Sequence, residues 1–140
     1  MKPQELRIGN YVNFKDRNDI LFCEVIGIDK SGYIHVIRNF NDGIQDDQPE
    51  SIEDITPIPL TEEWLLKFGF LKEEKKYDVS LLNTTTFWKN GLALTPIIDG
   101  KRFRTEMCSD YLSDINFDYV HKLQNFFFEL KSEELTIKKS

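Results

Sequence analysis

Apolar residues in the first part of the chain follow the two-residue period of β-strands. Residues 11–14 (YVNF) alternate weakly, residues 20–28 (ILFCEVIGI) form a mostly apolar β-branched run, and residues 31–40 (SGYIHVIRNF) follow a Ser-Gly turn. Several short strands in so short a stretch predict a small, strongly bent β-barrel of the SH3-like kind. We assign this barrel lobe to residues 1–58.

A short helix over residues 61–69 is the most sharply specified element. Two prolines hold the preceding chain extended. Thr61 is a typical N-cap residue, and two glutamates follow it at the positive end of the helix dipole. Leu60 and Leu65 occupy the positions of a hydrophobic staple, and Gly69 suits the left-handed residue that ends a helix. We interpret this stretch as a hinge between two lobes and not as a catalytic loop.

Residues 59–140 are predicted to form a second, α+β lobe. Strand patterns within 77–107, with Asn-Gly and Asp-Gly turn signals at 90–91 and 99–100, predict an antiparallel meander. The preceding LKEEKK segment, residues 71–76, is interpreted as a charged turn.

A C-terminal amphipathic helix is predicted over residues 119–130, with Asp118 as its N-cap. Its apolar stripe is expected to pack on the sheet of the second lobe, and residues 134–138 are expected to add an edge strand. The whole chain is therefore predicted to be α+β and mostly β.

The polar side of that helix is unusual because it carries an aromatic residue beside a histidine and amides. The residues concerned are Phe128, His121, Gln124 and Asn125. One account buries both faces of the helix. The other makes this side a surface for a partner protein or for a second copy of the chain, since exposed aromatics of this kind mark interfaces.

The net charge of −6 over 140 residues opposes general nucleic-acid binding, which needs a basic surface. A run of acid without a basic residue extends from position 42 to position 54, and comprises Asp42, Asp46, Asp47, Glu50, Glu53 and Asp54. It is either a solvated loop or an acidic docking or DNA-mimicking edge. Nucleic-acid binding through the barrel is the weakest alternative, and would use Arg7, Lys15, Arg17 and Arg38.

No motif for catalysis, a metal or a cofactor is present in the sequence. Cys23, His35, Cys108 and His121 are scattered singly, without the local spacing of a zinc site. A nucleophile pair of Cys108 and His121 would lack a strained elbow or a glycine-rich oxyanion loop. We therefore expect a non-enzymatic protein without a cofactor.

The best candidate for a small-molecule site is the segment DGKRFR. Arg102 and Arg104 share one face of an extended strand, where two guanidinium groups could grip a phosphate or carboxylate. Lys89 and Trp88 are placed on the neighbouring strand, adding charge and a stacking surface. The alternative is a sheet face that is simply solvated by charge.

No apolar run is long enough to span a bilayer, and the N-terminus lacks the apolar core of a signal peptide. These features predict cytoplasmic residence and no membrane association.

Four blocks spread along the chain resemble an uncharacterised family of short proteins from Bacteroidetes genomes and their phages and prophages. The blocks are LRIGNYV, PIPLTEEWLLKFGF, YVHKLQNFFFEL and EELTIK. The resemblance implies a phage or mobile-element origin and no enzymatic activity, and it supplies no site residue. We expect a binding protein that acts by occupancy of a host or phage protein, or by self-association as a homodimer. The alternative is an anti-defence protein that sequesters an anionic nucleotide signal.

Overall fold

The computed structural model describes residues 3–16, 19–38, 46–75, 84–96, 102–105 and 116–137. The chain divides into two compact units. The first holds residues 1–58 and 119–134, and the second holds residues 59–118 and 135–140. Each unit contains one five-stranded antiparallel sheet, and an α-helix belongs to each. The predicted mostly-β, α+β class is confirmed.

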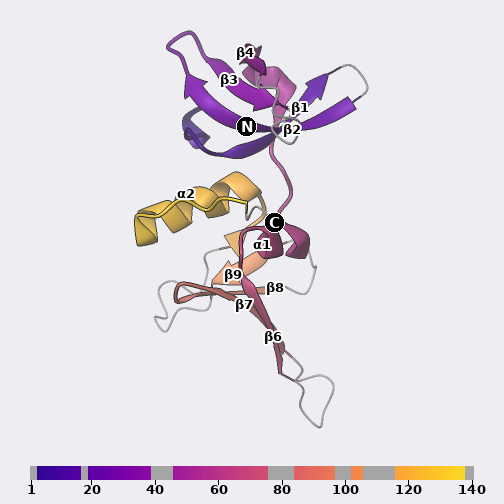
Figure 1. Ribbon diagram of the computed structural model, residues 1–140, viewed down its shortest axis with the longest axis vertical. Coiled ribbons are helices and arrows are strands. Elements are labelled where there is room, and N and C mark those ends of the chain that lie inside the picture. The colour runs from indigo at the N-terminus through magenta and orange to yellow at the C-terminus, as the bar shows by residue number, and fades with distance from the viewer. Residues whose placement is uncertain are drawn as a thin grey trace. The chain divides into compact units, whose positions relative to one another are not determined.

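The sheet of the first unit has the strand order β4-β3-β2-β1-β5. Figure 1 labels four of these strands, β1 to β4. The elements are η1 (Pro3–Glu5), β1 (Tyr11–Asp16), β2 (Asp19–Ile28), β3 (Tyr33–Arg38), β4 (Asp46–Ser51), η3 (Ile52–Asp54) and β5 (Ile55–Thr56). The strand β5 returns to the far edge of the sheet and pairs with β1. The sheet formed by the described strands is open, and no closed barrel is detected among them.

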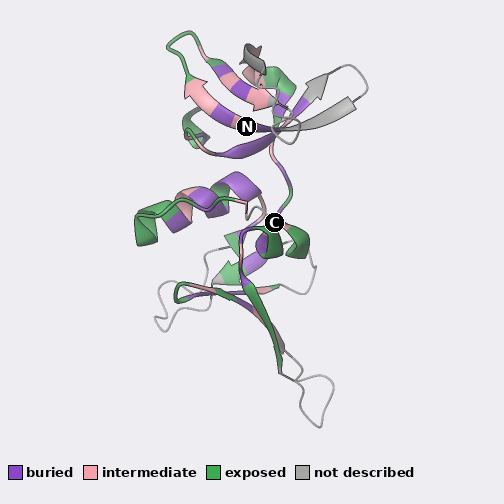
Figure 2. Cartoon of the chain, viewed as in Figure 1, coloured by how far each residue is buried: buried purple, intermediate pink, exposed green. Residues whose placement is uncertain are grey.

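The core of the first unit lies on one face of this sheet because alternate residues of the strands point inward. In β3, Ile34 and Val36 are fully buried, whereas His35 between them is half-buried (Figure 2). The buried cluster consists of Leu6, Val12, Phe14, Cys23, Val25, Ile34, Val36 and Ile55. This alternation is the period-two pattern that the sequence carries.

The C-terminal helix α2 (Val120–Lys131) belongs to the first unit, whereas we predicted that it packs on the second sheet. Its N-cap residue is Tyr119 and not the predicted Asp118, and Tyr119 makes no side-chain capping bond. The Val120 N–H instead donates to the Ile58 carbonyl at 2.9 Å. A backbone group distant in sequence therefore satisfies the helix start. No helix in the described parts of the chain is long and apolar enough to cross a membrane.

In the second unit, the predicted short capped helix forms as α1 (Glu62–Lys67). The hydroxyl of Thr61 accepts a backbone N–H of the first turn at 3.4 Å. At the other end, Gly69 has a φ of 90°, and the Phe70 N–H donates to the Leu65 carbonyl at 3.0 Å. This is the left-handed termination that the glycine predicts.

The second sheet has the strand order β10-β9-β8-β7-β6. Its strands are β6 (Leu71–Lys75), β7 (Thr84–Lys89), β8 (Leu92–Pro96), β9 (Phe103–Thr105) and β10 (Asn116–Phe117). The predicted Asn90-Gly91 turn joins β7 to β8 with positive φ at both residues, 49° and 84°. The second turn signal, at 99–100, lies outside the described residues.

Two segments of the second unit differ from their predictions. The LKEEKK segment, predicted as a turn, contains strand β6, which pairs with β7. Its composition misled because Glu and Lys are depleted in strands, yet an exposed edge strand tolerates them. Lys72 also bonds to the carboxylates of Glu62 and Glu74, at 2.7 and 3.2 Å. At the C-terminus, residues 134–137 lie outside any strand, and the side chain of Leu135 is buried there instead.

Candidate functional site

The acidic run of the first unit forms an edge of its sheet. Asp46–Ser51 is strand β4, the outermost strand, which pairs residue by residue with β3. The loop interpretation is therefore wrong for this part of the run. Glu53 and Asp54 follow in η3 and are both exposed. We call β4 and η3 together the acidic edge. Asp42 lies outside the described residues, and the structure describes only the backbone of Asp46 and Asp47.

All of the net charge of the protein belongs to the first unit. Its residues include 8 basic and 14 acidic side chains, a balance of −6, whereas the second unit has 10 of each. The acidic edge is the densest source of that charge. The first unit therefore carries a net negative field, whereas the charge of the second unit is balanced.

Two amide side chains of α2 hold the start of the chain by hydrogen bonds. Gln124 is fully buried, accepts the Tyr11 N–H at 2.8 Å and donates to the Gly9 carbonyl at 3.0 Å. Asn125 accepts from the side chain of Asn10 at 2.8 Å and donates to the Glu5 carbonyl at 2.9 Å. These two members of the predicted partner-binding set are thus engaged within their own unit.

Phe128, another member of that set, is 38% exposed. The guanidinium of Arg7 lies 4.0 Å from its ring centroid, a cation–π contact. Arg7 also bonds to Glu134 and to Asn125. Arg7 is therefore held by three side chains of its own unit. Of the other basic residues considered for nucleic acid, Arg17 is outside the described residues, and only the backbones of Lys15 and Arg38 are described.

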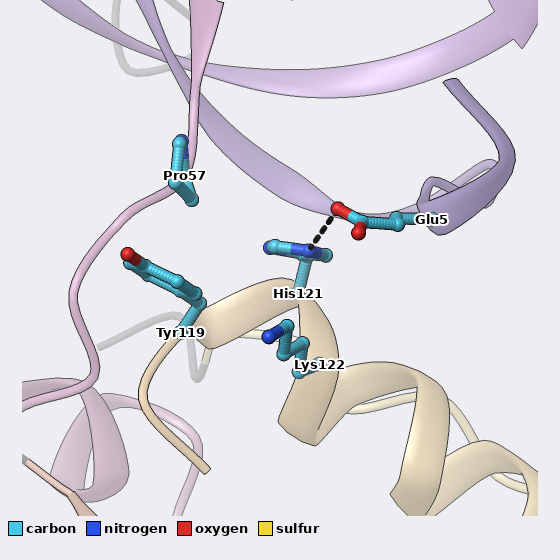
Figure 3. Close-up of a pocket in the computed structure, with 5 residues that line it drawn as sticks. All are labelled: Glu5, Pro57, Tyr119, His121 and Lys122. Atoms are coloured by element: carbon cyan, nitrogen blue, oxygen red, sulfur yellow. Dashed lines mark ion pairs between the residues drawn. The ribbon is translucent and has the colours of Figure 1, made fainter. Parts of the chain in front are cut away.

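A pocket of about 210 Å³ opens at the start of α2 (Figure 3). It is lined by Glu5, Pro57, Tyr119, His121 and Lys122. Of these residues, only His121 was a candidate site residue from the sequence. The others could not be predicted because the fold brings together segments near positions 5, 57 and 120 that are far apart in the chain. The closeness of Tyr119 and Lys122 to His121 in the sequence was the only available signal.

Arg104 of strand β9 and Arg102, which directly precedes the strand, both reach the surface. Arg102 and Arg104 are exposed on either side of Phe103, which is buried. We predicted that Trp88 and Lys89 lie on the strand next to these arginines. They lie on β7 instead, and β8 separates β7 from β9.

Those two β7 residues are also separated from each other. Consecutive strand residues point to opposite faces, so Lys89 faces away from Trp88. The Lys89 ammonium donates to the Phe68 carbonyl at 2.5 Å, at the end of α1. Lys89 therefore does not join the predicted anion site, whereas Trp88 and Arg104 lie on the same face of the sheet with β8 between their strands.

Two of the remaining chemical candidates, Cys23 and His35, belong to the first unit. Cys23 is a fully buried core residue, and His35 lies 3.5 Å from the carboxylate of Asp29. Burial acts to raise the pKa of Asp29, but the N–H groups of Tyr33 and Ser31 and the His35 side chain together lower it. Cys108 lies outside the described residues. Within the described part of the chain, no group of three His, Cys, Asp or Glu residues could hold a metal ion.

No known protein family, curated protein or solved structure matches this chain.

Proposed function

We propose that the protein is a non-enzymatic binding protein that occupies a basic protein partner through the acidic edge. The observation that carries this proposal is the concentration of the whole net charge, −6, in the first unit. A patch of one sign steers and orients a partner of the opposite sign. A phage or mobile-element origin, and the family resemblance that suggests it, remain predictions.

The form of the edge favours a partner that adds a strand or lies along one. An outer strand presents backbone N–H and C=O groups on the side away from its neighbour, and proteins recognise extended segments in this way. The acidic composition of the β4 sequence and its proline disfavour pairing with a second acidic copy. A basic segment would instead place opposite charges across the new pair, which stabilises it.

Self-association is the less favoured form of this proposal. Two copies meeting at the acidic edge would bring like charges together, which opposes binding. A homodimer would instead use the surface of α2 at Phe128, which is 38% exposed. Native mass spectrometry of the gently purified protein distinguishes a monomer from a dimer.

The proposal is tested by reversing charge at Glu53 and Asp54, which are exposed and whose side chains support no described core contact. A partner that co-purifies at low salt is identified and purified, and its affinity for Glu53→Lys/Asp54→Lys is measured by calorimetry. We expect a loss of at least about tenfold and a steep salt dependence. Glu129→Lys, an exposed change on α2, is the matched control. The proposal is refuted when the partner binds the parent protein, the Glu53→Lys/Asp54→Lys variant and the Glu129→Lys control with equal affinity.

A second candidate is the sequestration of an anionic nucleotide by Arg102 and Arg104. It is favoured only by the exposure of Arg102 and Arg104 on either side of buried Phe103. A nucleotide carried through purification would add mass that denaturation removes. Arg102→Glu/Arg104→Glu would abolish that added mass, whereas Lys89→Met would not, since Lys89 bonds to the Phe68 carbonyl. The same added mass in the arginine variant would exclude this candidate.

The finer fold assignment also remains a proposal. An SH3-like topology of the first unit is supported by the return of β5 to β1 after the short helical turn η3.

Nucleic-acid binding by this unit is disfavoured by its charge of −6.

A further inference from the structure

The pocket at the start of α2 is a separate feature from the acidic edge. Figure 3 shows the side chains of Pro57, Tyr119 and His121 around it, with Glu5 and Lys122 beside them. All five residues belong to the first unit. Three of them offer flat or apolar surfaces, and the other two bring one negative and one positive charge.

We propose that this pocket binds a small zwitterion that carries a planar ring, of the size and chemistry of a free aromatic amino acid. This is a small-molecule activity, and it does not depend on the protein-binding function proposed above.

The volume of the pocket limits what it takes. It measures about 210 Å³, whereas pockets for drug-sized ligands measure about 300–1,000 Å³. A dinucleotide or a long peptide segment would not be enclosed by such a site. A molecule as large as one amino acid would be.

The ring surface is already built. The rings of Tyr119 and His121 are stacked, with an interplanar angle of 18° and 6.0 Å between centroids. His121 is only 1% exposed, so it supports the Tyr119 ring from within, and the partly exposed Tyr119 ring is the surface open to a ligand. Pro57 adds an apolar surface. A planar ring placed against such a surface gains the stacking energy of an aromatic pair without ordering the wall first.

The two charges explain why a zwitterion fits better than an ion of one sign. The Glu5 side chain is 44% exposed, and its carboxylate lies 3.9 Å from His121 Nε2. The Lys122 ammonium lies 5.2 Å from the centre of the Tyr119 ring. A simple cation would gain only from Glu5, and a simple anion only from Lys122. A zwitterion places its ammonium at Glu5 and its carboxylate at Lys122, near the positive end of α2.

Three ligands of one shape test this assignment. L-Phenylalanine carries both charges, phenethylamine lacks the carboxylate, and 3-phenylpropanoate lacks the ammonium. Binding is followed through the backbone amide resonances of residues 119–122 during titration. We expect L-phenylalanine to bind with a dissociation constant on the order of 1 mM, and each analogue more weakly.

Two protein variants complete a cycle with these ligands. Glu5→Gln should weaken L-phenylalanine about two- to fivefold and leave 3-phenylpropanoate unchanged. Lys122→Met should weaken L-phenylalanine by a similar factor and leave phenethylamine unchanged. The matched controls are Glu129→Gln and Lys131→Met, exposed residues on the same helix and outside the pocket lining. Both targets have exposed side chains, so the fold should tolerate the changes.

The pattern of losses across ligands and variants decides whether both charges are recognised. Cross-specific losses, each variant affecting only ligands that carry the opposite charge, support the zwitterion site. Opposite effects of the two variants on L-phenylalanine would show that only one charge is recognised and would overturn the proposal. The absence of a saturable shift at the solubility limit of L-phenylalanine would do the same. None of these outcomes depends on the acidic edge, so the two proposals succeed or fail independently.

Discussion

The two units are similar in secondary structure and differ in where their polar groups lie. In the first unit, three polar residues are buried, Asn10, His121 and Gln124, and the net charge is −6. In the second, the residues described as buried are all hydrophobic and the charge balance is zero. The first unit joins segments far apart in sequence through directed hydrogen bonds. The second is a mainly contiguous stretch that packs by apolar contact.

This difference means that different kinds of substitution should lower the folding stability of the two units. An apolar core loses stability in proportion to the volume removed from it. A polar seam loses stability when one partner of a buried hydrogen bond is removed, because the other is left unsatisfied.

The largest effect is expected from Phe87→Ala in the second unit. Phe87 is 1% exposed and meets Phe103 edge-to-face, with 6.0 Å between ring centroids. Truncation should lower the free energy of unfolding by about 3–5 kcal/mol. Both tryptophans, Trp64 and Trp88, belong to this unit, so their fluorescence in a denaturant titration reports its unfolding. An unchanged midpoint would mean that Phe87 is not core.

Gln124→Met tests the polar seam of the first unit, by which we mean the hydrogen bonds that Gln124 and Asn125 of α2 make with residues 5–11. The substitution keeps the length of the side chain but leaves the Tyr11 N–H and the Gly9 carbonyl without their side-chain partner. We expect a loss of about 2–4 kcal/mol, measured by hydrogen exchange of the β1 and β2 amides. Gln124→Glu keeps an acceptor for the Tyr11 N–H but places a carboxyl group at a fully buried site, so at neutral pH it should destabilise the unit at least as much as the Met change. Equal stability of the Met variant and the parent protein would mean that the hydrogen bonds of Gln124 do not stabilise the first unit.

Gly69→Ala concerns the end of α1. Its φ of 90° is a conformation that residues with a Cβ atom rarely adopt. The variant should lose about 1–2 kcal/mol, again followed by tryptophan fluorescence. Ala substitution at Leu66, which is 46% exposed, provides a control in the same helix. A larger effect at Leu66 than at Gly69 would be incompatible with the left-handed termination.

Glu24→Gln should give the smallest effect, and a stabilising one. Burial, with the nearby charge of Glu134, raises the pKa of Glu24 above its ordinary value. The raised pKa means that the charged carboxylate disfavours folding at neutral pH, and this cost is absent below the pKa of the unfolded chain. The variant should therefore gain about half a kcal/mol at pH 7 and none in acid. Thermal unfolding at both pH values checks the sign, and a pH-independent difference would contradict it.

The elements that local sequence describes well are those whose interactions are local. The short helix α1 has its cap, its buried residues and its terminating glycine within ten consecutive positions, 61–70. The Asn90-Gly91 turn is likewise an interaction between neighbours. Such elements could be predicted because no distant residue is needed to form them.

The errors arose where a distant segment supplied the partner. Asp118 was expected to cap α2, but the Ile58 carbonyl does so. Gln124 and Asn125 looked like surface residues, yet their partners lie more than a hundred positions earlier in the chain. The charged segment 71–75 forms a strand because β7 pairs with it. In each case the deciding group is absent from the local pattern.

By itself, the sequence determined the mostly-β class, the short capped helix, the amphipathic C-terminal helix and the sign of the net charge. These depend on composition, on periodicity and on contacts between close neighbours. Only the tertiary structure decided that α2 belongs to the first unit and that its amides are internal. It also brought Glu5, Pro57 and Tyr119 to one pocket. The reason is physical: a buried hydrogen bond or a pocket wall requires two groups in space, and one-dimensional patterns specify only one of them.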